Sequence, residues 1–156
     1  MNRTIDDTDA RILGLLQDNA RVTQAEIAKQ VGLAPSAVLE RIRKLEARGI
    51  VRGYAALLDP RVVDRALLAF VAVRATDDGP EMPVAHRLAG IPEVLEVHHV
   101  AGDDCYLLKV RARDAEHLGE LLRTSINPIP EVTSTRTTIV LGSVKESPRV
   151  PIHVTA

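Results

Sequence analysis

The sequence of 156 residues contains a single cysteine and no long apolar run. A membrane-spanning helix needs roughly 20 predominantly apolar residues, and no stretch approaches that length. Cys105 alone cannot form an internal disulfide, and it has no clustered partners for a zinc site. The first residues run into Asp6 and Asp7 without the apolar stretch of a secretory signal. We therefore expect a cytoplasmic protein that does not enter a membrane.

The sequence also lacks the patterns that are typical of an active site or a metal centre. No Ser/His/Asp set, glycine-rich phosphate loop or pair of carboxylates is linked to a feature that would make it catalytic. His98 and His99 are adjacent on a predicted strand, so their side chains point to opposite faces and cannot chelate one metal. Asp104 beside Cys105 disfavours a reactive thiolate. We expect no enzyme, no metal site and no cofactor.

The chain has no large excess of charge, since its formal net charge is −1. The charge is unevenly divided, however. Residues 1–65 carry 11 Lys and Arg against 9 Asp and Glu, a net of +2, and residues 66–156 carry 9 against 12, a net of −3. The most basic window is 41–52, in which one acidic residue, Glu46, faces five basic ones: Arg41, Arg43, Lys44, Arg48 and Arg52. A local basic stripe of this kind can bind phosphates even when the whole chain is nearly neutral.

Two helices can be predicted from their capping residues. Asp6 is suited to cap a first helix over residues 7–18. Thr23 and Glu26 form a T-x-x-E capping box at the start of a second helix, and Gly32 suits the left-handed conformation that ends it.

A third helix follows the second after a tight turn. Pro35 suits the first turn of a helix, and Val38, Ile42 and Leu45 repeat at apolar spacing until Gly49. Two short helices joined by a Gly-containing turn, after a supporting helix, are typical of a helix-turn-helix. A basic run alone would favour a three-helix bundle with a solvated face. The caps, turn glycine, proline and apolar spacing coincide here, so we predict DNA binding.

The third helix is the predicted recognition helix. The start of such a helix reaches base edges in the major groove, and basic residues farther along contact phosphates. The N-terminus of the second helix can also donate hydrogen bonds to the DNA backbone. The candidates for base edges are Ser36, Ala37 and Glu40, with Arg41 beside them. The full predicted set is Thr23, Gln24, Pro35, Ser36, Ala37, Glu40, Arg41, Arg43, Lys44, Arg48 and Arg52.

Strand and helix patterns alternate in the second half of the chain. Residues 67–75 are nearly all apolar, which is typical of a strand buried on both faces. Further strands are predicted at 94–100, 106–111 and 132–141, with helices at 83–89 and after Asp114. Ile-Pro-Glu-Val occurs twice, at 91–94 and 129–132, each time between a helix and the next strand. Two such halves predict a ferredoxin-like βαββαβ domain.

The predicted fold class is therefore α+β with two domains. Residues 1–52 form a three-helix (winged) helix-turn-helix domain, 53–65 a strand linker, 66–146 the ferredoxin-like domain, and 147–156 a tail of unknown role. Residues 50–59 are apolar on both strand faces and stop at Pro60, so we expect a strand that pairs elsewhere. With helices on one face of the sheet, a second copy of the chain is the simplest cover for the other face.

Several segments in one order resemble the Lrp/AsnC (feast/famine) family of transcriptional regulators over nearly the whole chain. They are Ile5-Asp6 with Asp9-Ala10-Arg11-Ile12-Leu13, Glu26-Ile27-Ala28 with Val31-Gly32-Leu33, Glu40-Arg41-Ile42 with Leu45-Glu46 and Gly49-Ile50, Gly102-Asp103 with Tyr106 to Val110, and Arg136-Thr137. The resemblance implies an N-terminal DNA-binding domain, a ferredoxin-like effector domain, and dimers that often form octamers wrapping double-stranded DNA. It also implies amino-acid effectors bound between dimers, near the loop after the second strand of the sheet.

The implied effector loop departs from the usual pattern of the family. Gly-Asp-Tyr-Asp-Tyr is replaced by Gly102-Asp103-Asp104-Cys105-Tyr106, and Ala34 stands where a serine more often caps the recognition helix. Aspartates and turn N–H groups suit the ammonium and carboxylate of an amino acid, although Gly102-Asp103 is also an ordinary hairpin turn. The predicted effector residues are Gly102, Asp103, Asp104 and Cys105, with Ser134, Thr135, Arg136 and Thr137 as a second wall from a neighbouring subunit.

Three functions remain at this point. The first is a sequence-specific DNA-binding regulator whose assembly and DNA binding respond to a small effector, an amino acid. The second is a ligand-independent architectural protein that wraps DNA. The third is a small-molecule-binding or enzymatic ferredoxin-like domain with a helical appendage.

Overall fold

The computed structural model describes residues 4–76 and 81–153 of the chain. These residues form two compact units: residues 1–57 with 146–156, and residues 58–145. Among the described residues, no helix has the length and apolar character needed to cross a bilayer.

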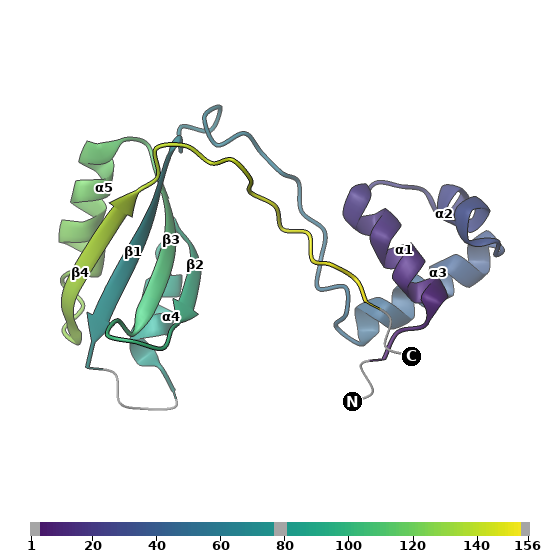
Figure 1. The fold of residues 1–156 in the computed structure, drawn as a ribbon, viewed down its shortest axis with the longest axis horizontal. Helices are drawn as coiled ribbons and strands as arrows, with labels where there is room; N and C mark the ends of the chain where they lie inside the picture. The colour runs from purple at the N-terminus through teal and green to yellow at the C-terminus, as the bar shows by residue number, and fades with distance from the viewer. Residues whose placement is uncertain (1–3, 77–80, 154–156) are drawn as a thin grey trace. The chain divides into compact units, whose positions relative to one another are not determined.

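The first unit contains three helices, as predicted (Figure 1). They are α1 (Asp7–Asp18), α2 (Gln24–Val31) and α3 (Pro35–Ala47). Asp6 caps α1 by accepting a hydrogen bond from the Asp9 N–H at 2.6 Å. The capping box of α2 is complete, since Thr23 accepts from the Glu26 N–H at 3.2 Å and the Glu26 carboxylate accepts from the Thr23 N–H at 2.8 Å. Gly32 then ends α2 in the left-handed region, at a φ of 73°.

One apolar cluster holds the three helices together. It consists of Ile12 from α1, Ile27 and Ala28 from α2, and Val38 and Ile42 from α3. Each fully buried aliphatic side chain contributes about 1.5–3 kcal/mol of transfer free energy. The inward face of α3 is therefore committed to packing, and the opposite face is left to solvent.

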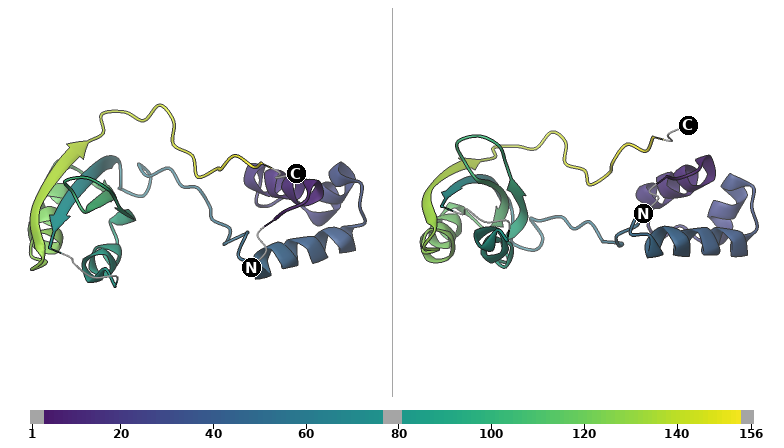
Figure 2. Two further views of the ribbon diagram at one scale, coloured as in Figure 1. Left: turned by 60° about the horizontal axis from the view of Figure 1, so that its bottom comes forward. Right: turned by 90° about the horizontal axis from the view of Figure 1, so that it is seen from below.

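The second unit is a four-stranded antiparallel sheet with helices on one face (Figure 2). Its elements are β1 (Leu67–Ala75), α4 (Pro83–Ala89), β2 (Val94–His99), β3 (Tyr106–Ala112), α5 (Ala115–Leu121), a π-helical turn (Leu122–Ile126) and β4 (Val132–Ile139). The strand order is β2-β3-β1-β4, so the predicted βαββαβ topology is confirmed. β1 is central, in agreement with its apolar sequence, and pairs with β3 and β4.

Alternation along the strands separates the two faces of this sheet. Val71 and Val73 of β1 and Leu108 and Val110 of β3 are fully buried and belong to the core that includes Leu88 and Leu118 of the helices. On the other face, β3 carries the half-buried Leu107, Lys109 and Arg111, whereas β1 carries the half-buried Phe70 and the buried Leu68 and Ala72. The helices therefore cover one face of the sheet only.

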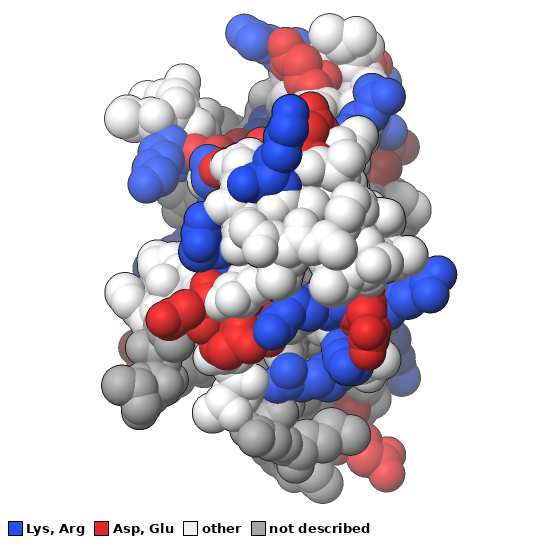
Figure 3. All heavy atoms as spheres, turned by 90° about the vertical axis from the view of Figure 1, so that its right-hand side faces the viewer, with Lys and Arg blue, Asp and Glu red and all other residues white. Residues whose placement is uncertain are grey.

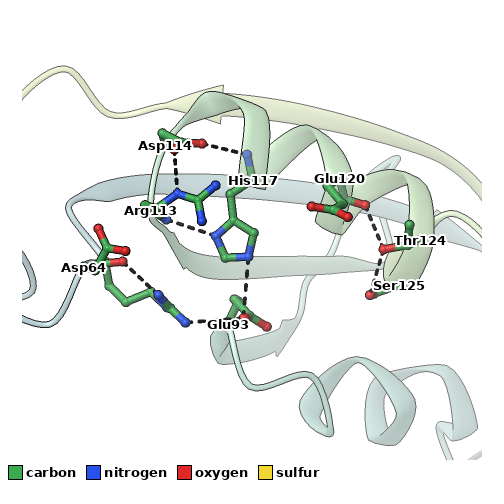
Figure 4. A network of polar contacts seen from close by, with 9 residues as sticks. Asp64, Glu93, Arg113, Asp114, His117, Glu120, Thr124 and Ser125 are labelled. Carbon is green, nitrogen blue, oxygen red and sulfur yellow. Dashed lines mark hydrogen bonds and ion pairs between the residues drawn. The ribbon is translucent and has the colours of Figure 1, made fainter.

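A polar network fixes the start of α5 (Figure 4). The Asp114 carboxylate accepts from the His117 N–H at 2.8 Å, and the Arg113 N–H donates to His117 Nδ1 at 3.2 Å. His117 Nε2 lies 3.8 Å from a carboxylate oxygen of Glu93, in the turn before β2. These contacts join α5 to that turn, and the predicted role of Asp114 as a cap is confirmed.

The predicted strand at residues 50–59 is wrong. No strand is assigned in this stretch, and the side chains of Leu57 and Leu58 are 79% and 69% exposed. A strand needs a neighbouring strand to satisfy its N–H and C=O groups, and the described residues of one chain supply none for this segment. The apolar pattern indicated that these side chains favour burial, but it did not show which strand or surface would bury them.

Candidate DNA interface and effector loop

The start of α3 is open to solvent. Pro35, Ser36 and Glu40 are exposed, and Ala37 is half-buried. Ala34 occupies the N-cap position with extended backbone angles, φ −71° and ψ 147°, and makes no side-chain capping bond. Its methyl group offers no acceptor, Pro35 has no N–H, and the Ala34 carbonyl accepts from the Ala37 and Val38 N–H groups at 3.0 and 3.1 Å. The start of α3 is therefore accessible to a partner.

Four basic residues that the sequence assigned to phosphates have different surroundings. Arg43 and Arg52 are exposed. Lys44 forms an ion pair with Glu40 one turn earlier, at 2.7 Å, and this neighbour lowers the pKa of the Glu40 carboxyl. Both side chains of that pair are solvated, so the pair is weak and can open towards DNA. Arg48 instead donates a hydrogen bond to the Thr4 carbonyl at 2.6 Å.

Arg41 was expected to reach towards DNA beside Ser36, Ala37 and Glu40, but its guanidinium turns towards α1. Its Nη1 atom is 2.7 Å from Asp6 Oδ2 and 2.8 Å from Asp9 Oδ1, which places the guanidinium between the two acidic residues at the start of α1. The Asp9 N–H bond and then Arg41 lower the pKa of the Asp6 carboxyl. Arg41 therefore joins α3 to α1. No local pattern in the sequence indicates this contact, because the partners are 32 and 35 residues away.

Charged side chains of both signs occur on the face drawn in Figure 3. Lys and Arg side chains surround an uncharged area, with Asp and Glu side chains between them.

At the start of α2, both candidate backbone contacts are exposed. The hydroxyl of Thr23 donates to Glu26 Oε2 at 2.7 Å, and Gln24 lies in the first turn. The bonds from Thr23 lower the pKa of Glu26. Thr23 is thus already used as a cap, whereas Gln24 is the freer of the two for a phosphate.

Tyr54 was missed by the sequence reasoning. Its hydroxyl donates to Glu46 Oε1 of α3 at 2.8 Å, and burial followed by that carboxylate raises the pKa of Tyr54 to about 12. The contact holds the segment after α3 against the end of the recognition helix. A tyrosine eight residues from an acidic helix residue is too common a pattern to have indicated it.

The loop between β2 and β3 is closed by backbone hydrogen bonds. The Val100 N–H donates to the Cys105 carbonyl at 3.0 Å, and the Cys105 N–H donates to the Val73 carbonyl at 2.9 Å. Gly102 has a φ of 126°, which L side chains rarely adopt. The Cys105 thiol is half-buried and donates to the Ala75 carbonyl at 3.1 Å. Cys105 therefore helps to anchor the loop to β1.

Two arginines of the sheet meet this loop. Arg136 of β4 forms an ion pair with Asp104 at 2.7 Å, and its side chain remains 76% exposed while that of Asp104 is 25% exposed. Arg74 of β1 donates through Nε to the Asp103 carbonyl at 2.9 Å. Arg74, which the sequence reasoning missed, pairs with Ser134 across the β1–β4 ladder, and Ala72 pairs with Arg136. The loop and β4 of one chain thus come together without a neighbouring subunit.

The other predicted β4 residues lie on the opposite face of the sheet. Thr135 and Thr137 pair with Val73 and Val71, whose side chains are in the helix-covered core. Thr135 donates to the side-chain oxygen of Asn127 at 3.2 Å. Of the predicted second wall, Ser134 and Arg136 therefore face the loop side, and the two threonines do not.

The adjacent histidines have separate partners. His98 Nε2 lies 3.0 Å from Glu96 Oε2, whereas the ring of His99 packs 5.5 Å from that of Tyr106. Within residues 4–76 and 81–153, no group of three or more His, Cys, Asp or Glu side chains is arranged to hold a metal ion.

Comparison with known proteins shows similarity in both units. Residues 5–52 match the winged helix-turn-helix DNA-binding model, and residues 68–150 match the Lrp/AsnC ligand binding domain. The leucine-responsive regulatory protein of Escherichia coli strain K12 is 38% identical over 152 residues, which cover 96% of this chain and 93% of that protein.

Solved structures agree with these matches. A transcriptional regulator from Neisseria meningitidis in complex with L-Met has a TM-score of 0.88 and 34% identity, covering 95% of this chain and 97% of its own. The feast or famine regulatory protein from M. tuberculosis complexed with L-methionine has a TM-score of 0.84 and 37% identity, covering 93% and 97%. The similarity therefore extends over both units.

Proposed function

Because the chain belongs to the Lrp/AsnC family of transcriptional regulators, which are DNA-binding proteins and not enzymes, we propose that its DNA binding and assembly respond to a free amino acid. The observation that carries this proposal is the loop at residues 102–105, where acidic and basic side chains from two strands and a turn converge. A ligand-binding domain on the same chain as a helix-turn-helix is the arrangement that lets an effector alter DNA binding.

The DNA contacts are assigned by exposure and by docking mode. Ser36, Ala37 and Glu40 face base edges from the open start of α3. Phosphates are contacted by Arg43, Lys44 and Arg52 and by the N-terminus of α2 at Thr23 and Gln24, whereas Pro35 only sets the entry of the helix. Arg41 and Arg48 hold the unit together and contribute to DNA binding indirectly.

The chemistry of the loop suits a zwitterion. Arg136 uses one nitrogen for Asp104, and a guanidinium has five N–H donors, so donors remain for a carboxylate. The exposed side chain of Asp103 is the acidic partner for an ammonium group, because Asp104 already has its counter-ion. The two related regulators that were solved in complex with L-methionine support an amino acid as the effector class.

Self-association is the third part of the proposal. Leu57, Leu58 and Val62 in the segment before β1 and Leu141 after β4 are exposed apolar side chains. Large apolar side chains that are exposed favour burial against another surface. A second copy of the chain, paired through this segment and the open face of the sheet, supplies that surface, and higher oligomers follow from further contacts.

Calorimetric titration of the full chain with each of the twenty amino acids tests the effector. We expect saturable heat for at least one of them, and loss of that heat in Arg136→Ala. Arg123→Ala, an exposed arginine in the turn after α5, is the matched control. Absence of heat with all twenty, with DNA binding also unchanged by them, would favour the architectural protein that wraps DNA without a ligand.

DNA retardation with Arg43→Ala and Lys44→Ala tests the interface. Each lost phosphate contact should lower the slope of log affinity against log salt by about 0.9. Unchanged retardation and an unchanged salt slope would exclude these residues from the interface, and would support a domain with a helical appendage that does not bind DNA.

A further inference from the structure

The tail after residue 145 has a sequence that favours an extended chain. Pro148 and Pro151 flank Arg149 and Val150. A proline locks its own φ and restricts the residue before it to extended conformations. Val150, which precedes Pro151, is therefore held extended before any partner is present, so docking it costs little further conformational entropy.

The end of α1 offers matching hydrogen-bonding groups to this segment. Gln17 Nε2 donates to the Val150 carbonyl at 3.0 Å, and the Val150 N–H donates to Gln17 Oε1 at 2.9 Å. The planar amide of one glutamine thus satisfies both backbone groups of one extended residue, as a neighbouring strand would. Gln17 is itself half-buried, and Ile152 two residues later is also half-buried whereas its neighbours are exposed.

An ion pair between the tail and α1 adds to these two hydrogen bonds. Asp18 is the last residue of α1, and the last turn of α1 contains no basic residue. An acidic side chain there faces the negative end of the helix dipole, which is unfavourable. Arg149 forms an ion pair with Asp18 and supplies the missing positive charge. Two adjacent residues of the tail, Arg149 and Val150, therefore make three contacts with two adjacent residues of α1, Gln17 and Asp18.

We propose that Gln17 and Asp18 form a docking site for an extended segment, and that its occupant is the tail of the same chain at Arg149 and Val150. The tail belongs to the same compact unit as α1 and follows β4 directly in the chain. When docked, the tail is a second, noncovalent link from β4 to α1, in addition to the covalent segment at residues 53–65. Because β4 also carries Arg136, a change at the effector loop can reach α1 through the docked tail.

Trypsin digestion of the full chain measures docking without DNA or an effector. Cleavage after Arg149 requires the tail to leave α1, so its rate reports the open fraction. Loss of the amide pair in Gln17→Ala should raise that rate roughly tenfold, the effect of about one net hydrogen-bond contribution. The matched control is Gln30→Ala, an exposed glutamine of α2, and cleavage after the exposed Arg61 is the internal reference. Equal rates after Arg149 in the wild type, Gln17→Ala and Gln30→Ala would overturn the proposal.

Two further variants separate docking from general loosening and from exchange between copies. Asp18→Ala removes the ion pair with Arg149 and leaves the Arg149–Val150 bond unchanged, so it should also accelerate cleavage after Arg149 and leave cleavage after Arg61 unchanged. In a Cys105→Ser background, Gln17→Cys with Val150→Cys should oxidise to a bond within one chain. A product of twice the mass on a non-reducing denaturing gel would assign the site to the tail of a second copy and overturn the choice of occupant.

Discussion

Replacing Arg41 by alanine should destabilise the DNA-binding unit more than it impairs DNA recognition directly. The guanidinium lies between Asp6 and Asp9, with Nη1–carboxylate distances of 2.7 and 2.8 Å. The side chain of Asp9 is 12% exposed, whereas that of Asp6 is 54% exposed. Removal of Arg41 therefore leaves the nearly buried carboxylate of Asp9 without its cation, whereas water can hydrate the exposed carboxylate of Asp6.

The magnitude follows from that asymmetry. Leaving a buried hydrogen-bonding group unsatisfied costs about 1–3 kcal/mol, and an exposed ion pair contributes roughly 0–1 kcal/mol. Arg41 itself is 34% exposed, so solvent screens part of the interaction, and we expect a loss of about 1–2 kcal/mol. For a unit of this size, a loss of 1 kcal/mol lowers the melting temperature by roughly 4–8 °C.

The assay is thermal and urea unfolding of Arg41→Ala beside Arg43→Ala, an exposed arginine on the same helix. A double-mutant cycle of Arg41→Ala with Asp9→Ala isolates the coupling between the two side chains.

The same ion pair makes stability depend on pH. The Asp9 N–H and Arg41 lower the pKa of the Asp6 carboxyl, so the stabilisation of the folded state by ionised Asp6 is present above the unfolded pKa of about 4 and is lost as the pH falls through the lower folded value. Arg41→Ala should weaken that acid dependence. Wild-type stability combined with DNA binding as weak as that of Arg43→Ala would refute this assignment of Arg41.

Three further outcomes are expected. Ala34→Ser should stabilise the first unit by about 1 kcal/mol, seen as a higher melting temperature, because the N-cap backbone is already extended and gains a side-chain acceptor; an unchanged melting temperature would contradict this. Thr23→Ala should cost about 1 kcal/mol in the same melt, because it breaks the capping box with Glu26, and a neutral result would show that the box contributes nothing. The pKa of Tyr54 is raised to about 12, so its stabilisation is present below the unfolded value of about 10 and is lost as the pH rises through 12. Ultraviolet titration of tyrosinate checks this as the difference between the wild type and Tyr54→Phe, in which the signal of Tyr106 cancels, and a difference transition near pH 10 would contradict it.

The first unit was largely predictable because its signals are local. A capping residue, the group it binds and the glycine that ends a helix all lie within a few residues of one another. Asp6, Thr23 and Gly32 therefore had identifiable roles in the sequence, and the structure confirms them. The contact of Arg41 with Asp9 was not predictable, because it depends on how α3 crosses α1 and not on spacing within one helix.

In the second unit, the order of strands and helices was predictable and the side-chain pairing was not. Apolar runs, Asp114 and the repeated Ile-Pro-Glu-Val pattern predicted the βαββαβ order, which the structure confirms. The register of β4 against β1 decides which of residues 134–137 face the loop, and a shift by one residue would reverse the choice. The sequence therefore pointed to β4 but did not separate Ser134 and Arg136, which face the loop, from Thr135 and Thr137, which do not.

The register of β4 also changes the meaning of the altered loop. In the family pattern an aromatic precedes the second aspartate, and in this chain Asp104 stands at that aromatic position. Its carboxylate is balanced by Arg136 of the same chain, so the substitution does not leave an uncompensated negative charge in the loop. The remaining donors of Arg136 and the exposed Asp103 still present opposite charges on one side of the sheet. Opposite charges suit a zwitterion, so the departure from the family pattern changes the shape of the candidate site and keeps both signs of charge in it.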